Sequence, residues 1–211
     1  MDQSRIAELL QPFLVSPLSE VQLKDILTYI DLLLRWNSRV NLTSIREPEE
    51  IVTRHFGESL FAARHLPASA ASVIDIGSGA GFPGIPIKIF SPETPLTLIE
   101  SNHKKVTFLR EVIRTLNLTG VTVFAGRAKD YAPSSPPNIV TLRAVEKFSA
   151  ILPTALRLAG PGGYLSLLIG EDQARIARRY SPDITWSDSV IIPGSSKRIL
   201  LIGKQNYNKV G

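Results

Sequence analysis

A glycine-rich segment that directly follows a short apolar run constrains this chain more than any other feature of its sequence. The run Val73–Ile76 has the composition of a buried strand, and the segment Gly77–Gly84 contains four glycines. Glycines adopt backbone dihedral angles that other residues avoid, and they let a ligand approach the main chain. A helix that starts after such a turn points its N-terminus at that ligand. The segment therefore predicts a strand–turn–helix unit that binds a nucleotide or nucleoside at the carboxyl end of the strand.

From Ala71 onward, short β-rich runs alternate with helical patterns, which is typical of a parallel sheet covered by helices on both faces. The turn Pro193-Gly194-Ser195-Ser196 predicts that the last two strands pair as an antiparallel hairpin. The expected fold is α/β, with a seven-stranded, mostly parallel sheet and an antiparallel terminal strand, as in Rossmann-like class I methyltransferases. Strands are expected at about 72–76, 96–100, 121–125, 138–142, 162–169, 184–191 and 197–203, and helices at about 82–90, 102–117, 148–159 and 171–180.

The first 70 residues have a purely helical pattern. Ser19 and Gln22 have the spacing of a capping box ahead of an apolar stripe, and Pro48 suits the first turn of a later helix. We therefore expect an N-terminal helical extension, residues 1–70, followed by a sheet domain, residues 71–211.

Two ligands compete for the glycine turn. Its last three glycines satisfy the G-x-G-x-x-G pattern of dinucleotide sites, which is weak evidence by itself. Asp75 stands two residues before the first glycine, the spacing Gly77-x-Gly79-x-Gly81 is closer, and a terminal hairpin is predicted. These three features favour S-adenosylmethionine over a dinucleotide. Glu100 ends the next predicted strand, where a carboxylate can accept both ribose hydroxyls of a nucleoside.

The composition limits the chemistry and the partners. The 211 residues suit one main domain with an extension, and no segment approaches the ~20 apolar residues of a membrane span. The chain has no cysteine, which excludes thiolate nucleophiles, thiolate zinc sites and disulfides, and no metal site is predicted. The first residues lack a signal-peptide pattern, so a cytoplasmic location is expected. A monomer is expected as well. The formal net charge of +5 suits a polyanionic partner, but many basic proteins bind no nucleic acid.

Three separated patterns lie between about residues 30 and 170. The first is Trp36-Asn37-x-x-x-Asn41-Leu42-Thr43, followed by His55 and Ser59; the second is the run from Asp75 to Pro86; the third combines Glu100-Ser101, Lys104-Lys105, Phe108-Leu109, Gly126-Arg127-Ala128 and Arg143-Ala144. Together these patterns resemble the RsmG (GidB) family of small-subunit rRNA guanine-N7 methyltransferases. The resemblance implies an enzyme that uses S-adenosylmethionine to methylate N7 of a guanine in 16S ribosomal RNA.

The resemblance also implies a set of donor contacts. It places them on Gly77, Phe82, Ala128, Lys129 and Arg143. The glycine-turn argument adds Gly79, Gly81 and Glu100, and the neighbouring Ser78, Ser101 and Arg127 complete the expected cofactor-binding set. Two positions depart from the family pattern. Lys129 stands where the family usually has Glu, and Ile169-Gly170 stands where a Lys-Gly pair is usual, which removes a positive charge near the RNA.

The expected reaction needs little acid–base chemistry. Guanine N7 has a free lone pair and no proton, so methyl transfer requires in-line positioning and a suitable electrostatic environment but no general base. Arg143 follows the fourth predicted strand, and we expect it to be the catalytic residue, in contact with the donor or with guanine O6. The alternative for Arg143 is an exposed arginine at the strand end, paired to a carboxylate. For His55, a buried place in the core is favoured over contact with RNA.

The predicted RNA-binding residues are basic residues in segments that flank the entrance of the expected ligand site. We expect Arg35, Arg39, Lys88, Lys104 and Lys105 to contact RNA of the small ribosomal subunit or of its assembly intermediate, with scattered solvated charge as the alternative. Two other functions stay open: a methyltransferase of the same fold that acts on a small molecule or a protein, and a non-catalytic relative that binds RNA or a nucleotide.

Overall fold

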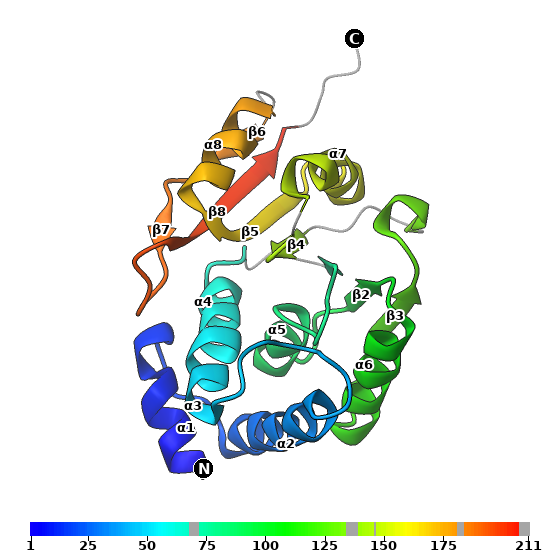
Figure 1. The fold of residues 1–211 in the computed structure, drawn as a ribbon. Coiled ribbons are helices and arrows are strands. Elements are labelled where there is room, and N and C mark those ends of the chain that lie inside the picture. The colour runs from blue at the N-terminus through cyan, green and yellow to red at the C-terminus, as the bar shows by residue number, and fades with distance from the viewer. Residues whose placement is uncertain (68–71, 134–138, 146, 181–183, 207–211) are drawn as a thin grey trace.

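The sheet has eight strands and lies between two layers of helices (Figure 1). The computed structural model describes residues 1–67, 72–133, 139–145, 147–180 and 184–206. The strands are β1 (Val73–Ile76), β2 (Leu96–Glu100), β3 (Val121–Ala125), β4 (Ile139–Arg143), β5 (Tyr164–Gly170), β6 (Ile184–Trp186), β7 (Val190–Ile191) and β8 (Arg198–Gln205).

The strand order is β3-β2-β1-β4-β5-β8-β6, and β7 pairs with β8 outside this path. Strands β1 to β5 are parallel, whereas β8 is antiparallel to β5. Since β6 is antiparallel to β8, it runs in the same direction as the parallel strands. The predicted fold is confirmed, including the terminal hairpin, which β7 and β8 form.

One predicted strand, 184–191, is wrong as a continuous element. The structure divides it into β6 and β7, separated by the polar run Ser187–Ser189. The Oγ atom of Ser187 accepts a hydrogen bond of 3.2 Å from the backbone N–H of Ile202. A side-chain oxygen thus takes the place of a backbone carbonyl, and this substitution interrupts the ladder.

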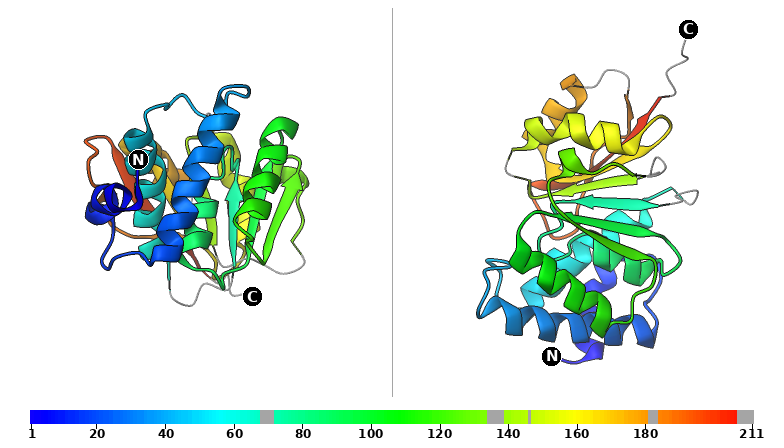
Figure 2. Two further views of the ribbon diagram at one scale, coloured as in Figure 1. Left: turned by 90° about the horizontal axis from the view of Figure 1, so that it is seen from below. Right: turned by 90° about the vertical axis from the view of Figure 1, so that its right-hand side faces the viewer.

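Helices cover both faces of the sheet (Figure 2). Two of them, α7 and α8, cover one face and bury a core of branched aliphatic side chains from β1, β4, β5 and β8. The other face is covered by α4, α5 and α6, with α1 and α2 packed outside them. The helices are α1 (Gln3–Leu10), η1 (Gln11–Phe13), α2 (Glu20–Asn37), α3 (Pro48–Glu50), η2 (Ile51–Gly57), α4 (Glu58–Arg64), α5 (Gly84–Phe90), α6 (His103–Thr115), η3 (Ala128–Asp130), α7 (Phe148–Ala159) and α8 (Glu171–Tyr180).

The N-terminal helices share a core with the sheet. Side chains from α1, α2, η2 and α4 pack in one cluster with side chains from α5, α6 and the first two strands. The predicted capping box is present, because the Ser19 hydroxyl accepts from Gln22 N–H and the Gln22 side chain accepts from Ser19 N–H. The expected boundary between residues 70 and 71 lies outside the described residues. Among those described, no helix is long and apolar enough to cross a membrane.

Candidate active site

Asp75 fixes the glycine turn to the sheet. Its carboxylate is buried at the end of β1, where Oδ2 accepts from Gly84 N–H at 3.1 Å and Oδ1 accepts from the Thr141 hydroxyl at 3.0 Å. These bonds join the turn, the start of α5 and β4. Burial raises the pKa of Asp75 to about 6, although the hydrogen bonds from Thr141 and Gly84 act in the opposite direction. Asp75 therefore positions the turn and is not exposed to a ligand.

Two glycines of the turn are required for different reasons. Gly77 has a φ of +69°, and a Cβ atom built there meets no atom within 4 Å, so its Cα borders open space that a ligand can approach. Gly81 has a φ of +89°, and a Cβ there would collide with the Tyr29 hydroxyl and the Ile85 side chain. The first glycine leaves room for a ligand, whereas the second allows α2 to pack against the turn.

Glu100 bridges the turn and the start of α6. Its Oε2 accepts from Gly79 N–H at 2.9 Å, and its Oε1 accepts from Asn102 N–H at 2.7 Å. Only 8% of the residue is exposed. Each carboxylate oxygen has further lone pairs, so Glu100 can accept more hydrogen bonds from a ligand without losing these two.

A cleft of about 390 Å³ opens beside Glu100, at the carboxyl ends of β1, β2 and β3. Its apolar walls come from β1, β2, η3 and the start of α7, and its polar groups come from the loops after β2 and β3. The lining residues are Ile76, Gly77, Ile99, Glu100, Ser101, Gly126, Arg127, Ala128, Lys129, Val145, Ala150, Ile151 and Thr154. Arg157 of α7 donates to the carbonyls of Ala128 and Lys129 at 3.1 and 3.3 Å, which ties η3 to α7.

The structure brings six of the expected cofactor-binding residues together in this cleft, namely Gly77, Glu100, Ser101, Arg127, Ala128 and Lys129. Ser78, Gly79 and Gly81 lie in the turn beneath it: the Ser78 side chain is buried and donates to Asp75 O, and Gly79 N–H is bonded to Glu100. Another side of the cleft, which the sequence patterns did not indicate, is formed by Val145, Ala150, Ile151 and Thr154. The sequence signal available was that the predicted helix 148–159 follows the fourth predicted strand, and the structure adds that this strand lies beside β1.

Phe82 lies in an aromatic stack that closes the inner side of the turn. Its ring stacks between Tyr29, with centroids 5.3 Å apart, and His55, at 4.7 Å. Phe56 packs edge-on at 5.1 Å. Phe82 is buried and does not line the cleft. Its observed role is to pack the extension against the turn, and a direct contact with a donor stays a prediction.

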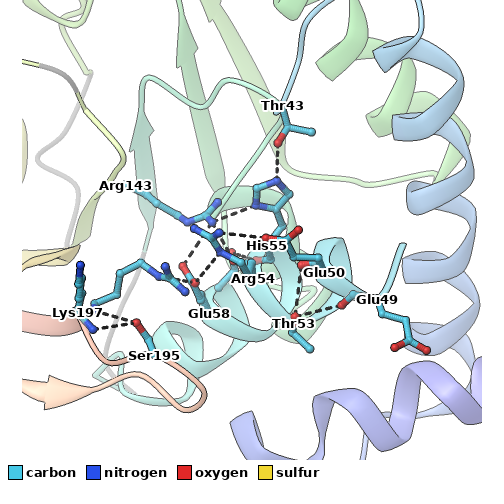
Figure 3. Close-up of polar contacts among 12 residues, drawn as sticks. Thr43, Glu49, Glu50, Thr53, Arg54, His55, Glu58, Arg143, Ser195 and Lys197 are labelled. Atoms are coloured by element: carbon cyan, nitrogen blue, oxygen red, sulfur yellow. Dashed lines mark hydrogen bonds and ion pairs between the residues drawn. The ribbon is translucent and has the colours of Figure 1, made fainter. Parts of the chain in front are cut away.

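Arg143 is tied to the N-terminal helices (Figure 3). One terminal nitrogen, Nη2, donates to the Arg54 carbonyl at 2.8 Å, contacts His55 Nδ1 at 3.0 Å and lies 3.3 Å from Glu58 Oε2. Burial lowers the pKa of the guanidinium, and Glu58 acts in the opposite direction. The pairing to a carboxylate expected in the alternative for Arg143 is therefore observed, but the side chain is largely buried and not exposed. Since Ile76 pairs with Leu142, Arg143 also lies level with Gly77 at the sheet edge.

His55 is a neutral, buried histidine. Burial lowers its pKa to about 3, and the positive charges of Arg143 and Arg54 add to the effect. With Nδ1 accepting from Arg143, Nε2 carries the proton and donates to the Thr43 hydroxyl at 2.8 Å. The expectation of a buried core residue is confirmed, and the ring also connects Arg143 to the loop before α3.

The basic residues expected on the RNA side divide into two groups. Arg35, Arg39 and Lys104 are exposed and Lys105 is half-buried, at the end of α2 and the start of α6. Lys88 is buried, and its amine donates to the carbonyls of Pro92 and Thr94. This capping of a loop at the far end of α5 supports a structural role for Lys88.

Known proteins with this fold include methyltransferases. An O-methyltransferase from Bacillus cereus, solved in complex with SAH, superposes with a TM-score of 0.59 at 18% identity and covers 84% of this chain and 90% of its own. TYW2 from M. jannaschii, solved with AdoMet, gives 0.56 at 17% identity over 71% of this chain and 74% of its own. At identities of 17% and 18%, these similarities show a shared fold and nothing further.

Sequence relatives are closer. A protein named Ribosomal RNA small subunit methyltransferase G from Chloroflexus aggregans is 39% identical over 197 residues, which covers 88% of this chain and 83% of the relative. Its namesake from Roseiflexus castenholzii is 39% identical over 88% of this chain and 84% of its own length. The family model GidB, described as rRNA small subunit methyltransferase G, matches residues 22–189. The chain therefore belongs to the GidB family of rRNA small subunit methyltransferase G.

Proposed function

We propose that this chain transfers a methyl group from S-adenosylmethionine to N7 of a guanine in small-subunit ribosomal RNA. The observation that carries the proposal is the cleft at the carboxyl ends of β1, β2 and β3. There the open backbone of Gly77, the carboxylate of Glu100 and an apolar wall lie together. We further propose that the chain acts as a monomer in the cytoplasm, on ribosomal RNA of the small subunit or of its assembly intermediate.

The cleft fits an adenosyl donor. Its volume of about 390 Å³ lies in the range usual for small-molecule sites. Glu100 would accept the two ribose hydroxyls, because both of its oxygens keep acceptor capacity. Ile76, Ala128 and Ile151 would pack on the adenine, and the absence of a side chain at Gly77 leaves room for the rest of the donor. Three further expected contacts, Ser101, Arg127 and Lys129, line the same cleft.

When bound, the donor supplies an electrophilic methyl group on a sulfonium. Guanine N7 needs no deprotonation, so the task of the protein is to hold the base in line with the methyl and to exclude water. Arg143 lies level with Gly77 at the end of β4, and we propose it as the catalytic residue. Its guanidinium can donate to guanine O6, which would leave N7 free for attack.

The proposed RNA contacts are Arg35, Arg39, Lys104 and Lys105. Arg35 lies in the last turn of α2 and Arg39 just after that helix, whereas Lys104 and Lys105 lie in the first turn of α6, close in sequence to Glu100. Exposed basic side chains contact phosphates and orient the RNA, whereas the target base is selected by contacts to the edge of the base itself. Lys88 is left out of this set because its amine is already bonded inside a loop.

A transfer assay tests the proposal. Small subunits purified from cells without this protein are incubated with the protein and tritium-labelled donor, and the modified nucleotide is then mapped by mass spectrometry. The expected product is one N7-methylguanine in the ribosomal RNA. Label found only in protein or in small molecules would show that the methyl acceptor is not RNA. If calorimetry detects no binding of S-adenosylmethionine, the protein is not a methyltransferase.

A further inference from the structure

A buried carboxylate holds three arginines at the edge of the sheet. Glu58, the first residue of α4, is 2% exposed, and its Oε1 lies 2.6 Å from Arg198 Nε and 4.0 Å from Arg54 Nε. Its Oε2 lies 3.3 Å from Arg143 Nη2. Figure 3 shows Arg54 of η2 and Arg143 at the end of β4 beside Glu58. Arg198, the first residue of β8, reaches the same carboxylate. We call Glu58, Arg54, Arg143 and Arg198 the arginine cluster.

The arginine cluster carries more positive than negative charge. Three guanidiniums face one buried carboxylate, and the only other acid paired with them among the described residues is Glu50, which binds Arg54 at 3.0 Å. Lys197, next to Arg198, is exposed and adds another positive charge. An excess of partly buried cations is unfavourable without counter-charge, so the surface at this point favours an anion.

The hydrogen bonding within the arginine cluster is incomplete. Both oxygens of Glu58 and the Nε atoms of Arg54 and Arg198 are buried, yet within the described part of the chain no well-directed hydrogen bond reaches them. They are held by charge alone. The Arg198 side chain is 33% exposed, so its guanidinium is accessible to solvent on one side. A guanidinium in this state can bind phosphate oxygens with its planar pair of donors.

The arginine cluster lies on the same sheet edge as the cleft. Arg143 ends β4, and Arg198 pairs with Gly170, the last residue of β5. The strand order places β8 three positions from β1, which corresponds to roughly 14 Å at the usual strand spacing. The arginine cluster is thus beside the proposed methyl-transfer point, on the side away from Glu100 and the donor cleft.

We infer that Arg198 and Arg54, held in place by Glu58, bind a backbone phosphate of the RNA close to the target nucleotide. The inference rests on the proposed function and adds a contact that sequence patterns did not indicate. Arg198 and Arg54 supply the anion contacts, Lys197 adds long-range attraction, and Glu58 is a positioning residue that never touches the RNA. If the arginine cluster served only to join the extension to the sheet, its loss would affect folding and leave RNA affinity unchanged.

Binding of a ribosomal RNA fragment over a salt series tests this inference. For Arg198→Gln we expect about three- to tenfold weaker binding and a salt slope lower by about one, since one phosphate contact is lost. Affinity for S-adenosylmethionine, measured by calorimetry, should stay unchanged. Arg198→Lys should keep the slope and lose only part of the affinity, because it retains the charge without the planar donor pair.

Arg179→Gln is the matched control, because Arg179 is an exposed arginine at the far end of α8. Equal salt slopes for Arg198→Gln and Arg179→Gln would overturn the inference. If Arg198→Gln does not fold, Arg54→Gln replaces it, since the Arg54 side chain is more exposed, and the same comparison decides. If the wild type methylates RNA while Arg198→Gln and Arg54→Gln have the same RNA affinity and salt slope as Arg179→Gln, that result would contradict the inference and leave the proposed function intact. A wild-type protein that neither binds nor methylates RNA removes both.

Discussion

Two buried glutamates stand at the same edge of the sheet, and they are held in opposite ways. Glu100 is bonded to the backbone amides of Gly79 and Asn102, which are neutral and fixed by the fold. Glu58 is surrounded by the charged side chains of Arg54, Arg143 and Arg198. The first arrangement leaves a negative group open to hydroxyl donors, whereas the second leaves a positive surface around a hidden negative centre. One sheet edge thus carries both proposed sites, one for a nucleoside and one for an anion.

The comparison predicts that replacing the two glutamates has different effects, on stability for Glu58 and on donor binding for Glu100. Glu58→Ala should lower the free energy of unfolding by about 3 kcal/mol, because the buried Arg143 loses its counter-charge. Urea denaturation measures the loss. Glu50→Ala is the control, since Glu50 pairs with Arg54 in solvent and should change stability by about 0.5 kcal/mol or less. Equal losses for the two variants would mean that Glu58 is not an internal counter-ion.

Glu100→Ala should act on the donor. We expect affinity for S-adenosylmethionine to fall by about 2–3 kcal/mol, on the order of 50-fold, because charged hydrogen bonds to the ribose are lost. Calorimetry measures this change. RNA affinity and its salt slope should match those of the wild type. An unchanged donor affinity would place the nucleoside away from Glu100.

His55, which contacts Arg143 of the arginine cluster, should make the stability of the protein depend on pH. The pKa of His55 is about 3 in the folded protein, below its ordinary value of 6.5, so the neutral ring is favoured by folding. This contribution is present above pH 6.5 and is lost as the pH falls toward 3. Between pH 6.5 and 5 the wild type should lose about 2 kcal/mol more than His55→Gln, whose amide can keep both hydrogen bonds. Identical pH profiles in urea denaturation would show that His55 is not buried as a neutral group.

The smallest expected effects come from replacing two glycines, and they distinguish the cost of backbone strain from the loss of room for a ligand. Gly77 and Gly194 have φ angles of +69° and +70°, and a Cβ atom meets nothing within 4 Å at either position. Alanine at each should cost about 1–2 kcal/mol of stability. Only Gly77→Ala should also weaken donor binding, by about tenfold, because its methyl group enters the cleft. Equal donor affinities for the two variants would mean that the donor does not approach Gly77.

The contrast between Glu100 and Glu58 also explains which features of the site could be predicted from the sequence. The strand–turn–helix unit, Glu100 and the capping box at Ser19 depend on residues close together in the chain or on the order of strands, so their pattern predicts them. The arginine cluster joins Glu58 to Arg198 across 140 positions, and no local spacing links them. Val145 and Ile151 were missed for a similar reason, since they reach the cleft only when β4 lies beside β1.

Local pattern also failed where a single side chain changes the backbone pairing. The β-rich run 184–191 predicts one strand, but the Ser187 hydroxyl bonds to Ile202 N–H and ends the ladder. Likewise the charge of Lys88 suggested the RNA surface, whereas its amine caps a loop. Both outcomes depend on the hydrogen-bond partner of one polar atom, which composition does not specify.

A crystal structure of the protein with S-adenosylhomocysteine and a guanine-containing RNA fragment tests the central claim most directly. The account predicts both ribose hydroxyls on the carboxylate of Glu100, the adenine against Ile76 and Ala128, and a phosphate at Arg198. A nucleoside bound outside this cleft, with the Glu100 carboxylate contacting only the protein's own amides, would contradict it.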